Sequence, residues 1–277
     1  VVVSTYFVKR LAEIGRPDLQ GWVFAGVGGG TALVGLAILG LMLTTAPSRM
    51  AWQIFGLATL AVTACIFFVL GRRSIVHATT GPSRDGPNDD TSTALAWHLI
   101  LPYGAVGAGY IIPATYLPIM GQQAVSSPLI FGWAWPVFGL AAAVSTLITA
   151  RLHATCSDRQ IWISSQLVMA LGLLLPALWP HIAFVVIGGI CVGGTFMVIT
   201  MAGLKEAHRL AGSANPQYHI AAMTTAFALG QIIGPFLAGW TYDATASFTW
   251  PLLLASAILV LTLVPMFTHS TPVEQRP

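Results

Sequence analysis

The chain of 277 residues is 56% hydrophobic and only 8% charged, with a formal net charge of +3. A soluble domain carries about 25% charged residues, so this composition excludes an ordinary water-exposed enzyme and predicts a chain surrounded mostly by lipid. The few positive charges are expected in loops, and they give no reason to expect a nucleic-acid partner.

The first eight residues, VVVSTYFV, are apolar but too short to cross a bilayer. Positive charges follow this run instead of preceding it, which is not the order of a secretory signal. We interpret residues 1–8 as the end of a further span whose earlier part is missing. A short segment at the membrane interface is the alternative.

The next stretch, GWVFAGVGGGTALVG, raises the question of a phosphate-binding loop. Its glycines lack the Gly-x-Gly-x-x-Gly spacing of a dinucleotide-binding turn, and no lysine of a phosphate loop lies nearby. We predict a lipid-embedded helix instead. Its small residues Gly26, Gly30, Thr31 and Gly35 fall on roughly one side, where they permit close helix packing.

Eight apolar stretches are long enough to cross about 30 Å of hydrocarbon as helices. Helices are expected because lipid offers no partners to backbone N–H and C=O groups. The stretches also lack the alternation of barrel strands. The sequence therefore predicts an all-α polytopic membrane protein with eight full transmembrane helices, at Gln20–Leu43, Met50–Leu70, Ala96–Ile119, Pro128–Ala150, Gln160–Trp179, Ile182–Leu204, Tyr218–Trp240 and Thr249–Thr268.

The basic residues predict the orientation of these spans. The termini and every second loop between the spans hold all the lysines and arginines except Arg49. These segments lie on one side of the membrane. Positive residues stay on the cytoplasmic side, so we expect both ends of the chain in the cytoplasm. The predicted location is the cell inner membrane, crossed several times.

One long polar stretch divides the chain into domains. Residues 71–95 are rich in Gly, Pro, Ser, Thr and Asp, which is typical of a flexible linker. We expect residues 1–70 to belong to an N-terminal bundle, 71–95 to form a cytoplasmic linker, 96–268 to form a six-helix bundle and 269–277 to form a cytoplasmic tail. Six helices after such a linker are half of a twelve-helix transporter.

Ionisable groups are scarce inside the spans. No Asp or Glu lies at a span centre, although a buried carboxylate is the usual proton relay of a pump. No His-Glu-x-x-His or Gly-x-Ser-x-Gly motif occurs, so we expect no enzyme, no metal and no cofactor. Protons remain a candidate coupling ion, through missing helices or through a histidine such as His98.

Three stretches carry a family resemblance: WHLILPYGAVGAGYIIPATYLPIMGQQ, GGICVGGTFMVITMAGLKEAHRL and AAMTTAFALGQIIGPFLAGWTYDATASF. Together they resemble the major facilitator superfamily, in its YbfB/YjiJ-type branch. The resemblance implies a major-facilitator-like helical bundle in which this chain runs from the end of helix four to helix twelve. The first three to four helices would then be lacking. It also implies that helices seven, eight, ten and eleven line a central cavity.

Polar residues on those helices are the candidate substrate-binding residues: Tyr103, Tyr110, Thr115 and Gln231. A glutamine in hydrocarbon should face a polar cavity or a partner, so an interhelical hydrogen bond is the alternative for Gln231. For the tyrosines, the alternatives are packing or a position in the aromatic belt.

Small residues and prolines in several spans, the first one included, are candidates for helix packing or gating. Glycine allows close approach and proline removes a hydrogen bond and kinks a helix; static packing and static kinks are the alternatives. The candidates are Gly26, Gly30, Gly107, Gly109, Pro113, Gly193, Gly194, Gly234 and Pro235.

We therefore expect a secondary active transporter that moves a small solute by alternating access. Its partners would be that solute, the lipid bilayer and, as a candidate coupling ion, protons, and the full-length protein is expected to be a monomer. A truncated or non-transporting membrane protein on the same scaffold is the alternative. The sequence identifies neither the solute nor the direction of transport.

Overall fold

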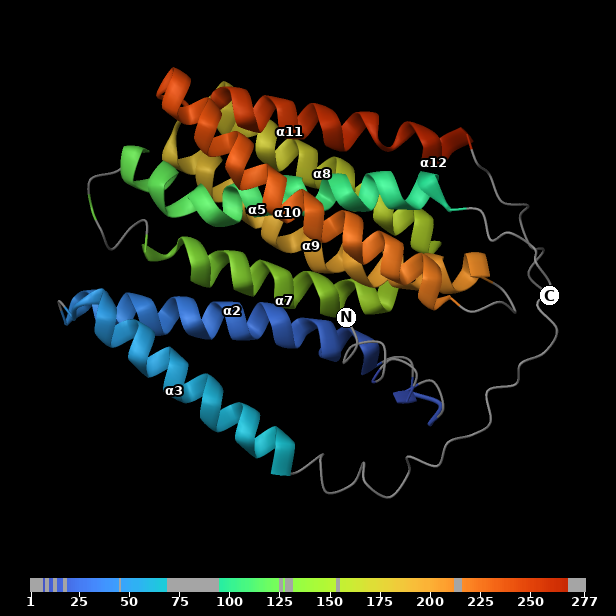
Figure 1. The fold of residues 1–277 in the computed structure, drawn as a ribbon, viewed down its shortest axis with the longest axis horizontal. Helices are drawn as coiled ribbons and strands as arrows, with labels where there is room; N and C mark the ends of the chain where they lie inside the picture. Colours follow the sequence, from blue (N-terminus) through green and yellow to red (C-terminus); the bar gives the residue numbers. More distant parts are fainter. Residues whose placement is uncertain are drawn as a thin grey trace. The chain divides into compact units, whose positions relative to one another are not determined.

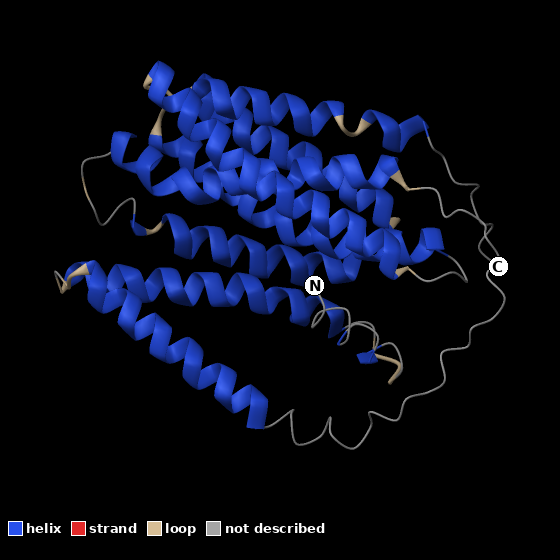
Figure 2. Cartoon of the chain, in the orientation of Figure 1, coloured by secondary structure: helices blue, strands red, loops and turns tan. Residues whose placement is uncertain are grey.

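The computed structural model describes residues 7, 10–11, 14–16, 19–44, 46–68, 95–124, 127, 132–152, 155–211 and 216–268. Regular structure in these ranges is helical, and they contain no strand (Figure 2). Eight of the helical segments are long and apolar enough to cross a membrane, which confirms the predicted all-α polytopic fold. The predicted linker, except for Leu95, and the predicted tail lie outside the described residues.

The helices follow the predicted spans closely, and the first has the predicted bounds. Most of the others differ at one or both ends, and the largest differences are in the fourth, which begins at Ala134 instead of Pro128, and in the sixth, which continues past Leu204 to Ala211. The helices are α2 (Gln20–Leu43), α3 (Ser48–Ile66), α5 (Trp97–Ala124), α7 (Ala134–Leu152), α8 (Asp158–Leu178), α9 (Ile182–Ala211), α10 (Gln217–Thr245), α11 (Thr249–Leu261) and α12 (Val264–Thr268).

The described residues belong to two compact units, one within Val1–Ala37 and Leu95–Pro277 and the other within Ile38–Ala94. In the second unit, α3 buries no residue, and large apolar side chains such as Trp52 and Leu57 are exposed. Such a surface is stable only against lipid or another protein. The predicted division of the chain into bundles and linker stays a prediction.

Helix α5 is the centre of the first unit. It contacts α7, α8, α9, α10, α11 and α12 (Figure 1). Its helix is continuous through Pro102, Pro113 and Pro118. Proline inside a helix removes one backbone hydrogen bond, and in a membrane protein packed neighbours make this tolerable.

The contact between α5 and α10 is close enough to exclude side chains. A Cβ atom added at Gly107 would overlap the carbonyl oxygen of Phe227, and one added at Gly230 would overlap the carbonyl oxygen of Gly104. At Gly234 the added atom would lie 3.1 Å from the Ala108 carbonyl oxygen. Small residues bring helix backbones together in lipid, where no hydrophobic force does so.

Helix α2 packs on α7 within the first unit through glycines of which only Gly35 belongs to the predicted side of small residues. A Cβ added at Gly28 would overlap the backbone nitrogen of Ala143, and one at Gly35 would lie 2.6 Å from Cδ of Pro136. Gly26 and Gly30 have open space around them. Their proposed role in packing or gating stays a prediction without a contact of this kind.

Buried polar side chains connect α8 to α11. The Gln166 side chain is fully buried, accepts a hydrogen bond from Trp162 Nε1 at 2.8 Å and donates from Nε2 to the Leu259 carbonyl oxygen at 2.9 Å. Ser256 Oγ donates to the Ala170 carbonyl oxygen at 2.8 Å. These bonds satisfy polar groups that would be costly to leave unpaired in lipid.

The last predicted span is interrupted between α11 and α12. Pro265 has no N–H for the carbonyl oxygen of Leu261, and the chain turns at Thr262 and Leu263. Gln166 donates to the Leu259 carbonyl oxygen and to Thr262 Oγ1, 3.2 Å away. It therefore caps the break that the proline produces.

Charged side chains gather where α8 begins and α9 ends. Lys205 Nζ lies 3.9 Å from Asp158 Oδ1, and Arg209 Nε donates to Glu206 Oε2 at 2.9 Å. Glu206 is only 4% exposed, and it lies in the part of α9 that continues past the predicted end of the span. It is thus a buried acidic residue inside a helix, close to its end.

The α5–α10 contact gives the first test. Gly107→Ala adds one methyl group that overlaps the backbone of Phe227. A backbone cannot move aside as the end of a flexible side chain can. We expect unfolding in detergent to become easier by about 1–3 kcal/mol, the usual cost of overpacking. Gly30→Ala is the matched control, because its added methyl group meets nothing. Equal stability of the two variants would contradict the described contact.

Candidate functional site

A cavity of about 190 Å³ lies within the first unit. It is lined by α2, α5, α9 and α10, and it is open beside Val27, which is 47% exposed. The lining side chains belong to Val23, Phe24, Val27, Tyr103, Tyr110, Phe196, Met197, Thr200, Thr224 and Phe227.

The lining residues occupy matching levels on the four helices. They lie in the first half of α2, α5 and α10 and near the middle or in the second half of α9. The cavity therefore lies between the middle of the bundle and the end where α5 and α10 begin.

Aromatic rings form most of the wall. Tyr110 is stacked with Phe196, with ring centroids 5.0 Å apart, and with Phe227, with centroids 5.5 Å apart. Tyr103 contacts Phe227 in a tilted arrangement at 5.2 Å and Trp162 edge-on at 5.7 Å. Such spacings are favourable for aromatic pairs, so the rings hold one another in place.

The polar groups of the cavity are few and mostly occupied. Gln231 Nε2 donates to the Tyr110 hydroxyl oxygen at 2.5 Å. The hydroxyl groups of Thr200 and Thr224 donate to carbonyl oxygens one turn back in their own helices, at 2.9 Å and 2.7 Å. The Tyr103 hydroxyl interacts with the Thr200 side chain. What remains free for a solute is acceptor capacity on the threonines and the Tyr110 hydroxyl proton, for which the described residues supply no acceptor.

The structure brings three of the four predicted site residues together. Tyr103 and Tyr110 line the cavity, and Gln231 contacts Tyr110 from α10. Thr115 is exposed and is not among the lining residues. Substrate binding by these residues stays a prediction, and the interhelical hydrogen bond foreseen as the alternative for Gln231 is present.

Sequence reasoning missed the apolar lining. Phe196 and Phe227 complete the aromatic wall, and Phe24 contributes from α2. Phe196 and Thr200 lie one turn apart, as do Thr224 and Phe227, so each pair faces one side of its helix, but this spacing does not tell which side faces the cavity. Polar character alone selected the tyrosines, Thr115 and the glutamine.

The predicted packing or gating residues other than Gly26 and Gly30 lie at helix contacts of differing closeness. A Cβ at Gly193 would lie 2.6 Å from the Phe138 carbonyl oxygen, whereas one at Gly194 would make only ordinary contacts at 3.9 Å. One at Gly109 would meet the flexible side chain of Leu259 at 2.9 Å. Pro113 is buried in α5, and Pro235 offers its carbonyl oxygen to the Tyr116 hydroxyl at 3.0 Å. Whether any of them acts as a gate stays a prediction.

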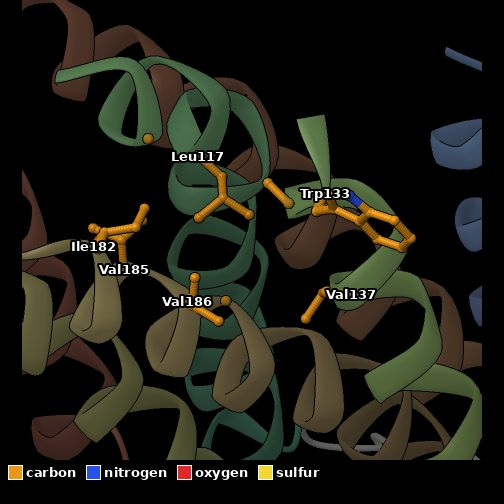
Figure 3. A pocket seen from close by; sticks show the side chains of 9 residues that line it. Leu117, Trp133, Val137, Ile182, Val185 and Val186 are labelled. Carbon is orange, nitrogen blue, oxygen red and sulfur yellow. The ribbon is translucent and has the colours of Figure 1, made fainter. Parts of the chain in front are cut away.

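A second cavity is too small for an organic solute. It measures about 50 Å³ and lies between Leu117 of α5, Trp133 just before α7 and Val185 of α9 (Figure 3). A cavity of about 150 Å³ is the size that holds benzene. A third space of about 150 Å³ lies at the ends of the helices, beside Gln123 and Ser247.

Histidine, cysteine and carboxylate side chains do not form a cluster of three or more that could hold a metal ion within the described ranges. The walls of the 190 Å³ cavity likewise contain no charged side chain among the described residues. The arrangement is therefore suited to binding by shape and hydrogen bonds.

Eight apolar helices with an internal cavity of this kind define a multi-pass membrane protein with the construction of a carrier. A sequence model of the family described as "Uncharacterised MFS-type transporter YbfB" matches residues 1–266. The chain therefore belongs to this family of major facilitator superfamily transporters, which confirms the sequence resemblance. A comparison with curated proteins found no match.

Two amide–phenol pairs between α5 and α10 provide an internal comparison. Gln231 donates to Tyr110 inside the bundle, and Gln123 donates to Tyr242 at 2.7 Å on the exposed surface. In a double-mutant cycle of unfolding with Tyr110→Phe and Gln231→Leu, we expect a coupling of about 1 kcal/mol.

The matched cycle with Tyr242→Phe and Gln123→Leu should give a coupling near zero, because water replaces the exposed bond. Similar coupling in both cycles would contradict the sheltered position of the Tyr110–Gln231 pair.

Proposed function

We propose that this protein is a secondary active transporter that carries a small uncharged solute across the cytoplasmic membrane by alternating access. Tyr103, Tyr110 and Gln231 contribute to the solute site together with Phe196 and Phe227. Thr115 is not part of the proposed site, because its side chain is exposed and away from the cavity.

The observation that carries this proposal is the 190 Å³ cavity between spanning helices. An internal cavity at a level where helices meet is where carriers bind their solutes. Membership in a transporter family supports the same function and favours transport over catalysis. The lack of charged lining residues supports an uncharged solute, because an unpaired charge is expensive inside a membrane.

Two helix contacts made by small residues lie next to the cavity, and they support a rocking motion of the helices. The α5–α10 contact and the α2–α7 contact both consist largely of glycine and alanine backbones. Few side chains interlock there, so relative movement has few contacts to break. Proton coupling stays a prediction: no acidic residue lines the cavity, and the buried Glu206 is paired with Arg209.

The proposed orientation places the α7–α8 loop and the C-terminus in the cytoplasm, following the distribution of basic residues. Glu206, Arg209 and Lys205 would then lie at the cytoplasmic end of α9. The cavity would lie in the cytoplasmic half of the bundle.

Alternating access can be tested without knowing the solute. In a variant of the full-length gene product without native cysteines, Thr224→Cys places one thiol on the cavity wall. We expect a membrane-impermeant maleimide to modify it from either side, in inside-out and in right-side-out vesicles, because the cavity opens to each side in turn. Labelling from one side alone would contradict alternating access. Leu229→Cys, on the exposed surface of the same helix, is the control for reagent leakage.

A native cysteine can report the proposed orientation of the chain in the membrane. Cys156 lies between α7 and α8 and is partly exposed. It should react with the impermeant maleimide in inside-out vesicles and be protected in right-side-out vesicles. His181→Cys, between α8 and α9, should show the reverse pattern. Labelling of Cys156 from outside the cell would overturn the proposed orientation.

A further inference from the structure

We propose that the solute of the 190 Å³ cavity is a neutral molecule with a single flat aromatic ring and one hydroxyl group. This inference rests on the proposed function, and it adds the chemical class of the solute. Four properties of the cavity carry it: its size, its lack of charge, its parallel rings and the few hydrogen-bonding groups left free.

The volume of the cavity favours a solute with one ring. An apolar protein cavity of about 150 Å³ accepts one benzene molecule, and this cavity of about 190 Å³ leaves room for one further substituent. A second fused or linked ring would extend past Val27, which is 47% exposed, out of the cavity. The flexible Met197 side chain allows limited adjustment at one wall.

The uncharged lining of the cavity favours a neutral solute. The lining consists of aliphatic, aromatic, methionine and threonine side chains, with no acid or base among the described residues. An anion would meet no cationic partner. A cation would meet ring faces but no carboxylate to offset its lost hydration. A neutral molecule avoids both costs.

Ring geometry favours a flat solute over a saturated one of equal size. The Tyr110 ring plane lies 8° from that of Phe196 and 14° from that of Phe227. Parallel rings from α5, α9 and α10 define a common plane direction along the cavity wall. An aromatic solute can make edge or offset contacts with these rings and gain energy beyond the burial of its area.

The free hydrogen-bonding groups match one hydroxyl. Thr200 and Thr224 use their protons within their own helices, and Thr224 presents an acceptor oxygen, whereas the Thr200 oxygen also interacts with the Tyr103 hydroxyl. Tyr110 accepts from Gln231 and keeps its own proton to donate. A hydroxyl group can donate to a threonine and accept from Tyr110 at once, whereas a solute without polar atoms would leave these groups unpaired.

Methionine methyl NMR tests this class directly, with phenol as the probe. In the full-length gene product labelled with ¹³C-methyl methionine, a bound aromatic ring shifts the Met197 methyl signal through its ring current. We expect a saturable shift at Met197 and no saturable shift at Met50, which is exposed on α3 and reports partitioning into the detergent. Excess cyclohexanol should not displace phenol, and benzoate and benzylammonium should not produce the shift.

Variants add a second readout. Phe227→Leu removes one ring of the wall and should weaken phenol binding about tenfold. Phe248→Leu is the matched control: this ring stacks on Tyr242, with centroids 4.4 Å apart, and does not line the cavity. Absence of a saturable Met197 shift, displacement by cyclohexanol, stronger binding of benzylammonium or benzoate, or unchanged binding in Phe227→Leu would each overturn the proposed class.

The outcome separates this inference from the proposed function. Phenol binding with the expected pattern, combined with one-sided labelling at residue 224, would contradict transport and support the aromatic site. Two-sided labelling without phenol binding would support the carrier and overturn the solute class.

Discussion

The close approach of α5 and α10 is the constraint on which the candidate site depends. Where the backbone of Gly107 meets that of Phe227, no side chain separates the two helices. This contact sets the distance at which Tyr110 of α5 and Phe227 of α10 stack. In lipid, water does not push helices together, so van der Waals contact between small residues takes over that role. The positions of the glycines in α5 and α10 therefore determine how the aromatic rings that line the cavity stack.

Two glutamines show how position decides the role of one chemical group. Gln166 is fully buried and has partners for both ends of its amide, so it joins α8 to the interrupted last span. Gln231 is half-buried and donates to a tyrosine whose own proton remains free at the cavity. A fully satisfied amide fixes a structure, whereas a partly satisfied group beside a cavity leaves bonding capacity for a solute.

Sequence reasoning predicted the spans and the family well, because lipid leaves a long apolar helix as the only way to satisfy the backbone. It predicted the site less completely. Tyr103 and Tyr110 are seven residues apart and share a side of α5, whereas Thr115 is turned about 140° from Tyr110 by the helical period. Helical period alone could have separated them. The lining phenylalanines could not be chosen in this way, because an apolar ring in an apolar span gives no sign of whether it faces lipid, core or cavity.

The α2–α7 contact has a regular spacing with a mechanical consequence. Gly21, Gly28 and Gly35 face Ala150, Ala143 and Pro136, so both helices repeat every seven residues in opposite directions. A strict seven-residue repeat keeps two helices side by side in a shallow left-handed supercoil. Because the contact extends along the helices instead of crossing at one point, it has no pivot. Complete separation of α2 from α7 therefore has to give up all three glycine contacts.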